Sequence, residues 1–369
     1  MRYLGNKTRL LPFIARALRR LGISPGSAHD AFSGTASVGR ALKTRGWRVA
    51  SSDLMTYSYV FQRAYVVAQR VPSFADLRAV DPELRAAMRR ARFRRAVAAR
   101  GGGALHAVAE YLAKWIPPER GFVTRRFSPE GKRMYFTPAN ASRIDAARAR
   151  LHAWREEGLI GDDGYFLLLA ALIEGADRVA NTAGVYAAFI KSWQPNATRP
   201  LDLIPLAPVR GLRGSSAHLG DAAAVARALG PVDLLYVDPP YNSRQYAGYY
   251  HVPEIIARGW FSERPALAGK TGLLARGAPS SAWCKPREVG GALTELLAAT
   301  KARHVLVSYN SDGLLSEAAL RRALADASID GKVRRFTRAY RRYRADRDHA
   351  RRTYRDDGLR ELLYHVRLR

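Results

Sequence analysis

A short apolar run that is cut off by two prolines constrains the fold of this chain more than any other stretch. Residues 232–237 read Val-Asp-Leu-Leu-Tyr-Val, which has the length and the β-branched character of a buried strand. The run stops at Asp238-Pro239-Pro240-Tyr241, where the two prolines cannot donate hydrogen bonds to a neighbouring strand. A carboxylate and an aromatic ring are therefore expected on a rigid turn at the carboxyl end of a strand. In open α/β sheets this edge binds ligands.

The residues of this turn suit the activation of an amine that is attached to a purine or pyrimidine ring. Such an amine is a poor nucleophile, because its lone pair is delocalised into the ring. The Asp238 carboxylate can accept a hydrogen bond from one N–H, and the Pro239 carbonyl can accept one from the other. Together they would favour a tetrahedral nitrogen and free the lone pair for in-line attack, while Tyr241 offers a flat face for base stacking. The alternative is an ordinary turn, since Asp, Pro and Tyr are common in turns.

The turn resembles the Asp-Pro-Pro-Tyr motif of amino-methyltransferases that use S-adenosylmethionine (SAM), and the whole chain is similar to the Dam-related class of DNA adenine methyltransferases. The resemblance implies that SAM is the cofactor and that no metal is needed. It implies a Rossmann-like α/β fold, with a mostly parallel sheet, helices on both faces and an antiparallel carboxyl-terminal hairpin. The catalytic residues that it implies are Asp238, Pro239, Pro240 and Tyr241.

The amino-terminal segment and the glycine loop are expected to form the cofactor site. Apolar residues at helical spacing follow Lys7 and run to Leu21, which predicts an amphipathic helix. The resemblance assigns Tyr3 and Lys7 to a motif that holds the methionine carboxylate. Further on, Gly34 allows a tight backbone turn before a helix that begins near Val38. Cofactor contacts are expected at Asp30, Phe32, Gly34, Thr35, Ala36 and Leu54, although Ala36 stands where the family usually has a second glycine.

Two further carboxylates complete this expected cofactor site. Asp53 ends a predicted strand over 48–53 and lies about 20 residues after Gly34, the spacing at which an acid accepts hydrogen bonds from ribose hydroxyls. Asp221 stands where relatives place an Asp that pairs with the adenine amine of SAM. Each has a simpler reading as a helix N-cap, because an Asp before a helix commonly caps it.

The charge of the chain points to a polyanionic partner. It carries 61 Lys and Arg against 32 Asp and Glu, a formal net charge of +29. Such a charge favours nucleic acid, although a bias towards arginine contributes to it. The segment 84–100 holds seven arginines and no acid, and basic residues then alternate with aromatic ones. Contacts with double-stranded DNA are expected at Arg89, Arg90, Asn181, Thr182, Tyr186, Lys191, Arg244 and Tyr246.

These features predict two regions. Residues 1–72 and 205–369 would form the SAM-binding catalytic domain, and 73–204 a mainly helical insert that recognises the target, with a hairpin-like segment at 181–203. Strands are also expected at 304–310, 332–341 and 361–369, and a buried helix at 165–180. The single cysteine, Cys284, excludes an internal disulfide. With no signal peptide or long apolar run apparent, we expect a cytoplasmic protein that associates with the nucleoid through DNA.

The expected activity is therefore methylation of the exocyclic amine of adenine in a specific duplex DNA sequence, by base flipping and direct transfer. A restriction enzyme is a possible cognate partner, and the system could serve restriction–modification, defence or epigenetic marking. Two alternatives remain at this stage: an rRNA adenine methyltransferase, and a catalytically inactive DNA-binding subunit. Cytosine amine methylation is disfavoured, since those enzymes usually carry Ser in place of Asp238.

Overall fold

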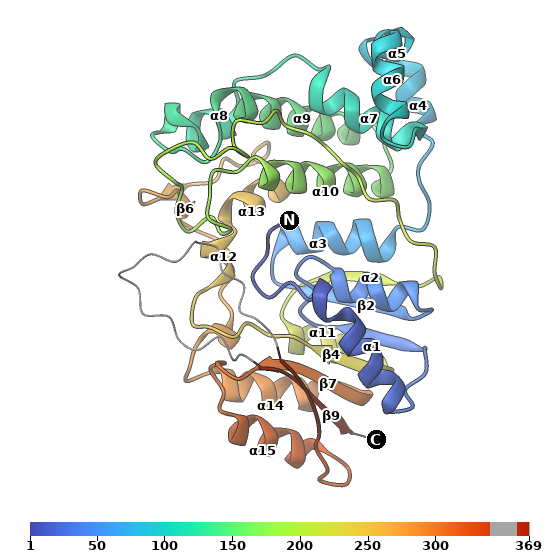
Figure 1. Ribbon diagram of the computed structural model, residues 1–369, viewed down its shortest axis with the longest axis vertical. Coiled ribbons are helices and arrows are strands. Elements are labelled where there is room, and N and C mark those ends of the chain that lie inside the picture. The colour runs from blue at the N-terminus through green and yellow to red at the C-terminus, as the bar shows by residue number, and fades with distance from the viewer. Residues whose placement is uncertain (340–359, 369) are drawn as a thin grey trace. The chain divides into compact units, whose positions relative to one another are not determined.

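The computed structural model describes residues 1–339 and 360–368, which form two compact units. We call Leu4–Gln62, Arg210–Gln245 and the part after Pro279 the sheet unit. We call Met1–Tyr3, Arg63–Val209 and Tyr246–Ala278 the helical unit. Figure 1 labels the α-helices and several strands of both units.

The sheet unit is built on seven strands in the order β3-β2-β1-β4-β7-β9-β8. Figure 1 labels β2, β4, β7 and β9 of this sheet. The pairs β1–β2, β1–β4, β2–β3 and β4–β7 are parallel, whereas β9 runs antiparallel to both β7 and β8. This confirms the predicted Rossmann-like sheet with an antiparallel hairpin at its end. The strands are β1 Ser27–Asp30, β2 Arg48–Asp53, β3 Ser216–Leu219, β4 Val232–Val237, β7 Ala302–Asn310, β8 Arg334–Ala339 and β9 Arg360–Arg367.

Helices cover both faces of this sheet. They are α1 Leu11–Arg20, α2 Ser37–Thr44, α3 Thr56–Gln62, α11 Ala222–Ala228, α14 Val289–Ala299 and α15 Glu317–Ala327, with the short 3₁₀ turns η1 Thr8–Leu10 and η4 Ala282–Cys284. The helix predicted to follow Lys7 is α1, whose apolar residues Ile14, Ala17 and Leu18 are buried. The helix predicted to begin near Val38 is α2.

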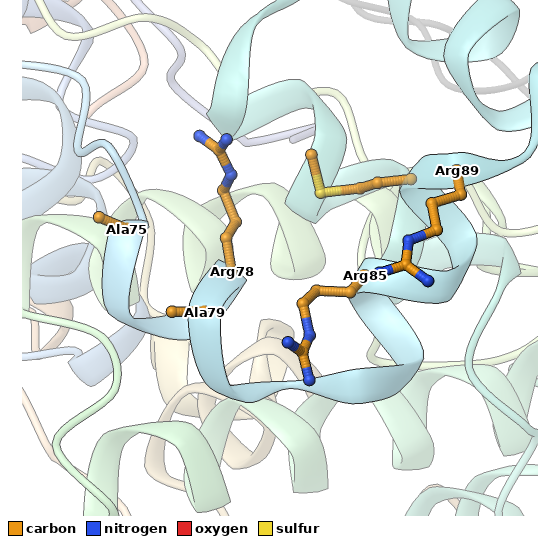
Figure 2. A pocket seen from close by; sticks show the side chains of 6 residues that line it. Ala75, Arg78, Ala79, Arg85 and Arg89 are labelled. Atoms are coloured by element: carbon orange, nitrogen blue, oxygen red, sulfur yellow. The ribbon is translucent and has the colours of Figure 1, made fainter.

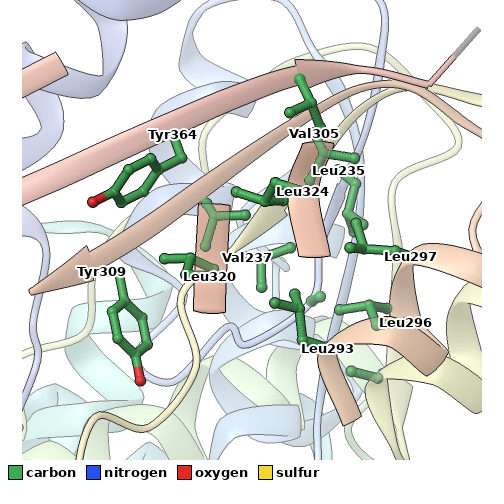
Figure 3. Close-up of a cluster of buried hydrophobic side chains, with 14 of the residues drawn as sticks. Leu235, Val237, Leu293, Leu296, Leu297, Val305, Tyr309, Leu320, Leu324 and Tyr364 are labelled. Carbon is green, nitrogen blue, oxygen red and sulfur yellow. The ribbon is translucent and has the colours of Figure 1, made fainter. Parts of the chain in front are cut away.

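One face of the sheet packs against α11, α14 and α15 in a continuous hydrophobic cluster (Figure 3). Leu235 and Val237 of β4 lie in it beside Val305 of β7, together with alternate residues of β9 such as Tyr364. Because successive side chains of a strand point to opposite faces, Tyr236, Asp238 and Glu361 belong to the other face. The strand pattern therefore directs these polar groups away from the cluster.

The helical unit contains nine α-helices within its described residues. They are α4 Ala75–Val80, α5 Pro82–Arg89, α6 Ala91–Ala98, α7 Gly103–Lys114, α8 Phe122–Phe127, α9 Pro138–Glu156, α10 Asp162–Arg178, α12 Tyr246–Tyr249 and α13 His251–Arg258. The same unit holds the π-helical turn η2 Arg63–Val67, the 3₁₀ turn η3 Pro129–Gly131 and the small hairpin β5 Leu267–Ala268 and β6 Leu273–Leu274. The predicted buried helix is α10, whose residues Tyr165 to Ile173 are all buried.

A single carboxylate joins α9 to α8. Asp145 of α9 accepts hydrogen bonds from the backbone N–H groups of Gly121, Val123 and Thr124, and from the Thr124 hydroxyl, at 2.7–3.0 Å. The N–H groups at the start of a helix have no acceptor within the helix, and for α8 Asp145 supplies one. The Gly121 backbone lies so close to Asp145 that an added Cβ would meet the carboxylate at 2.7 Å.

Asp145→Ala should therefore lower the free energy of unfolding by at least about 3 kcal/mol, because it leaves the buried N–H groups of Val123 and Thr124 and the half-buried one of Gly121 without this acceptor. Urea unfolding measures this change. Glu157→Ala, at an exposed position after the same helix, serves as the control and should change stability by less than about 0.5 kcal/mol. Equal stability of the two variants would contradict the role of Asp145.

The two units divide the chain differently from the expected 73–204 insert. Residues 63–72, 205–209 and 246–278 pack with the helical unit. Hydrogen bonds explain the last of these: Tyr249 accepts from the Tyr186 backbone N–H, and the Tyr135 hydroxyl donates to the carbonyl of Thr271. The segment 181–203 contains no strand and is irregular, whereas the hairpin of this unit is β5–β6.

Some predicted features lie partly outside the described residues. The strand expected at 332–341 appears as β8, and the one expected at 361–369 as β9, paired antiparallel as predicted. Residues 340, 341 and 369 of these predictions, and the arginine-rich connection between the strands, are not described. Within 1–339 and 360–368, no helix has the length and apolarity that a membrane crossing requires.

Candidate active site

The Asp238-Pro-Pro-Tyr241 turn begins directly after β4, which lies between β1 and β7 in the sheet. The carboxyl ends of these three parallel strands meet at one edge. Tyr241 packs edge-on against Tyr309 near the end of β7, with ring centroids 5.3 Å apart. The ring is therefore fixed from the neighbouring strand, as a platform for a flat ligand requires.

Lys7 lies on this turn. Its ammonium nitrogen is 3.1 Å from Asp238 Oδ1 and donates a hydrogen bond to the Tyr241 hydroxyl at 2.5 Å. The same nitrogen is 4.6 Å from the centre of the Tyr241 ring. The Tyr241 hydroxyl in turn donates to Asp238 Oδ1. Only 2% of the Lys7 side chain is exposed, so its positive charge acts on the Asp238-Pro-Pro-Tyr241 turn with little screening by solvent.

Two other carboxylates lie near this centre. Glu361, the second residue of β9, places Oε1 3.8 Å from the Lys7 nitrogen. Asp30, at the end of β1, accepts hydrogen bonds from the Gly39 backbone and the Ser33 hydroxyl through Oδ2. Burial raises the pKa of Asp30 to about 7, and the negative charge of Asp238 adds to this effect. Burial also raises the pKa of Glu361 to about 7, against the opposing effect of Lys7.

Burial likewise raises the pKa of Asp238 above its usual value, although Lys7 and the Tyr241 hydroxyl both oppose this shift. A carboxylate with a raised pKa is a better hydrogen-bond acceptor than an exposed one. The positive charge of Lys7 favours the ionised form of Asp238 and so opposes the effect of burial. The arrangement therefore provides a strong acceptor at the turn.

The glycine loop and the ends of β1 and β2 form a cradle of the kind that a nucleoside-containing cofactor needs. The Gly34 N–H donates to Asp53 Oδ2 at 2.8 Å, and the Met55 N–H donates to Asp53 Oδ1 at 3.0 Å. These bonds fix Asp53 beside the loop. Asp30 Oδ1 is buried and has no hydrogen-bond partner among the described residues, which marks a place for a donor from a ligand.

Ala36 adopts a left-handed backbone conformation, with φ 57°, and is fully buried. Gly34 is also left-handed, with φ 52°. The loop thus keeps a glycine-like backbone at the position where the resemblance expects a glycine, at a cost of about 1 kcal/mol. Phe32 is half-buried and packs edge-on against Trp283, while Thr35 and Leu54 are half-buried. All of these residues except Trp283 were predicted as cofactor contacts.

Two predicted cofactor residues have other contacts. Asp221 is exposed and caps α11, because its Oδ1 accepts from the N–H groups of Ala223 and Ala224. Asp221 thus has the N-cap role that its sequence position also allowed. Tyr3 lies in the helical unit, where its ring stacks on Tyr250 and contacts Tyr246.

Three of the residues predicted to contact DNA are buried in the helical unit. The Asn181 side chain donates to the Ile190 carbonyl and accepts from the Gln194 N–H. Thr182 accepts from Arg2, and the Tyr186 hydroxyl donates to Asp177. These side chains hold the irregular 181–203 loop in place, so the structure argues against direct contacts with DNA. By contrast, Arg89, Arg90, Lys191 and Arg244 are exposed, and Tyr246 is half-buried.

The exposed arginines include a group that lines an open groove on α4 and α5 (Figure 2). Arg85 and Arg89 follow one another at a spacing of four residues on α5, and Arg78 faces them from α4. Ala75, Ala79 and Met88 form the rest of the lining. The neighbouring Arg90 lies over the Trp115 ring, 5.6 Å from its centre. We call these four arginines the arginine groove.

Sequence reasoning missed Glu361 and Tyr309. Glu361 is the only acid in the last ten residues of the chain, and that was the available signal. The first residues of an antiparallel strand reach the edge at which the parallel strands end, so the predicted hairpin could have placed it at the site. Tyr309 lies in the predicted strand at 304–310, where an aromatic residue is typical of a core position.

A sequence profile of the D12 class N6 adenine-specific DNA methyltransferases matches residues 3–310 of this chain. The chain belongs to this family. Its relatives include the type II methyltransferase M.NlaIII of Neisseria lactamica, which is 30% identical over 94% of this chain and 93% of the relative. The type II methyltransferase M.FokI of Planomicrobium okeanokoites is 32% identical over 94% of this chain, and the modification methylase StsI of Streptococcus sanguinis is 28% identical over 99%.

The chain spans about half the length of M.FokI and of StsI, at 50% and 52%. Family membership confirms the resemblance stated from the motifs and does not favour the rRNA enzyme or the inactive subunit. The match covers the amino-terminal segment, the glycine loop, the helical unit and the Asp238-Pro-Pro-Tyr241 turn. Within the described residues, no group of three or more His, Cys, Asp or Glu side chains is placed to hold a metal ion.

Proposed function

We propose that this protein transfers a methyl group from SAM to the exocyclic amine of adenine in a specific sequence of double-stranded DNA. The observation that carries the proposal is the Asp238-Pro-Pro-Tyr241 turn, with a buried acceptor and a fixed aromatic ring, at the carboxyl end of the central strand β4. An amine on a base is the nucleophile for which this combination is suited.

The cradle at the ends of β1 and β2 would hold the cofactor. Asp53 would accept hydrogen bonds from the ribose hydroxyls, and Asp30 Oδ1 would accept from a polar group of the cofactor. Gly34 and Ala36 would let the backbone approach closely, and Lys7 remains our proposed partner for the methionine carboxylate. When bound, SAM supplies an electrophilic methyl group on a sulfonium centre. Asp221 would contribute only if its capping bonds leave an oxygen free.

The residues of the turn would do the rest of the chemistry. The target adenine must leave the base stack, since its amine cannot meet the methyl group inside the duplex. Tyr241 would then stack on the adenine, while Asp238 and the Pro239 carbonyl each accept one N–H of the amine and hold it near attack geometry. As the new N–C bond would form and the methyl–sulfur bond would break, positive charge would move from the sulfonium to the amine nitrogen, and the Asp238 carboxylate would stabilise that charge until a proton passes to water.

The arginine groove would contact the DNA backbone. A guanidinium group presents its N–H donors in a plane, which is the geometry that binds phosphate oxygens. Lys191, Arg244 and Tyr246 would add contacts. Binding to chromosomal DNA would place the protein in the cytoplasm with the nucleoid. Because the named relatives are type II and modification methylases, we propose a restriction–modification setting with a cognate restriction enzyme.

Replacing Arg85, Arg89 and Arg90 together by Ala should weaken binding to duplex DNA and reduce the slope of log K against log salt by about 3, because each lost phosphate contact lowers the slope by about 0.9. Fluorescence anisotropy over a range of salt concentrations measures the slope. The control removes three exposed charges of the sheet unit, at Arg287, Lys301 and Arg322, and should leave the slope unchanged. Equal slopes for the two triple variants would exclude the groove as a phosphate site.

The substrate is tested by offering unmethylated duplex DNA and rRNA in the same assay with labelled SAM. We expect label in the DNA alone. Label in the rRNA with none in the DNA would overturn the choice of substrate, while leaving the assignment of the catalytic turn intact.

A further inference from the structure

The antiparallel pairing of β9 with β7 places Glu361 at the edge of the sheet where β4 ends and Asp238 begins. It pairs with Asn310 at the end of β7, and the parallel partner of that strand is β4, which ends beside Asp238. Its place in the alternation of β9 puts its side chain on the same sheet face as Asp238. The side chain is 10% exposed. Ionising a carboxylate this far from solvent costs free energy unless a cation or a hydrogen-bond donor pairs with it.

Glu361 forms an ion pair with Lys7. Oε1 lies 3.8 Å from the Lys7 nitrogen, and Oε2 is buried with no hydrogen-bond partner in the described chain. The Lys7 nitrogen is thus shared between two carboxylates, at 3.1 Å from Asp238 and 3.8 Å from Glu361. When both carboxylates are ionised, this group of three side chains carries a net charge of −1, since 1 − 2 = −1.

The surroundings supply no second cation at hydrogen-bond distance within the described residues. The negative charge of Glu361 contributes to the raised pKa values of Tyr236 of β4 and Tyr241 of the turn. Its strand partner on β7, Asn310, is neutral. Arg338 of β8 is its partner on the other side, but the Arg338 guanidinium donates to the Arg9 carbonyl. Asp30 of β1 is a further carboxylate, whose pKa is raised by burial and by the charge of Asp238.

We propose that Glu361 is a positioning residue for methyl transfer: by neutralising Lys7, it leaves the negative charge of Asp238 to the target amine. This inference rests on the proposed function. The need for such a residue follows from charge. The Lys7 ammonium lies 3.1 Å from the carboxylate that is to stabilise a developing positive charge, and an ammonium there opposes a second cation. A second carboxylate on Lys7 removes that opposition and keeps the buried lysine paired.

The pKa of Glu361, raised by burial to about 7, makes this contribution dependent on pH near neutrality. The ionised form is the active one, so its contribution is present above this pKa and is lost as the pH falls through it. The negative charge of Asp238 adds to the raised pKa of Glu361. Replacing Glu361 by a neutral residue should therefore remove this titration from the pH profile.

The test is single-turnover methyl transfer to duplex DNA by full-length Glu361→Gln and Glu361→Asp. We expect Glu361→Gln to slow transfer by about 10- to 100-fold, with the Kd for SAM within about threefold of the wild-type value. The activity of this variant should also fall less on acidification, because the ionisation of Glu361 no longer contributes to the acid limb of the pH profile. Glu361→Asp keeps the charge and should recover most of the lost rate. Both variants should retain the wild-type circular dichroism spectrum.

Two results would overturn the inference. One is a Glu361→Gln variant with the wild-type rate and pH profile. The other is an equal loss of SAM binding and rate in both variants, which would make Glu361 a residue of the fold or of the cofactor site. Asp238→Ala, assayed in parallel, separates this inference from the proposed function. An active Asp238→Ala variant would overturn the proposed function, whereas an inactive one beside a normal Glu361→Gln variant overturns only the inference.

Discussion

Asp238→Ala should lower the rate of methyl transfer by about 1,000-fold or more, while SAM still binds. The variant removes the acceptor that holds the target amine and the charge that stabilises the transition state. In the cofactor cradle, Asp30 accepts hydrogen bonds from Ser33 and Gly39, and Asp53 accepts from Gly34 and Met55, and none of these four bonds involves Asp238. Single-turnover kinetics with labelled SAM and isothermal titration calorimetry measure the two quantities.

The matched control is Asp233→Ala. Asp233 lies near the amino end of the same strand and accepts two hydrogen bonds from Ser27, so its loss affects the sheet far from the reacting edge. We expect a lower melting temperature with a transfer rate within about threefold of the wild-type value. If Asp238→Ala instead loses SAM binding and rate together, Asp238 is a ligand of the cofactor and its assignment to the amine is wrong.

Lys7→Met should lower the transfer rate by about 100-fold and should move the acid limb of the pH profile to higher pH. The sign follows from the contacts: Lys7 lowers the pKa of Asp238, so its loss raises that pKa further, and a higher pH is needed to ionise the acceptor. Removing a buried partner of two carboxylates should also cost about 3 kcal/mol of stability at neutral pH. Kinetics from pH 5.5 to 9 and urea unfolding give both values.

The same variant tests the expected contact of Lys7 with the methionine carboxylate. A lysine has three donors, so it can serve the catalytic turn and a cofactor carboxylate together. A rise in the SAM Kd of about 10-fold or more would support the cofactor role. An unchanged Kd with the shifted pH profile would restrict Lys7 to the turn. An unshifted profile would contradict its electrostatic action on Asp238.

The strands that carry the chemistry were predictable because each has a strong local signal. Val232–Val237 is an apolar run closed by prolines, and Arg48–Asp53 ends in a polar residue at the spacing of a nucleoside site. The order of the motifs then predicted the mixed sheet, because a glycine loop between two short strands is typical of parallel α/β folds. Asp221 was ambiguous from sequence, since a cap and a ligand are both Asp residues before a helix.

Contacts between distant segments were not predictable. Glu361 meets Lys7 across almost the full length of the chain, and no local pattern specifies that pairing. Asn181 and Tyr186 look like polar loop residues in sequence, but the structure buries both. Asn181 bonds to Ile190 and Gln194 of its own loop, whereas the Tyr186 hydroxyl donates to Asp177 of α10. The segment 246–278 joins the helical unit through tertiary contacts, such as the hydrogen bonds that the Tyr135 hydroxyl donates to the Thr271 carbonyl and Arg148 Nε donates to the Ile256 carbonyl.

The most direct test of the proposed function is the identity of the methylated nucleoside. Duplex DNA that lacks adenine methylation is incubated with the protein and SAM, digested to nucleosides and analysed by mass spectrometry. The proposed function predicts N6-methyldeoxyadenosine that depends on SAM and disappears with Asp238→Ala. A methylated cytosine in its place, or no methylated base in DNA, would contradict it.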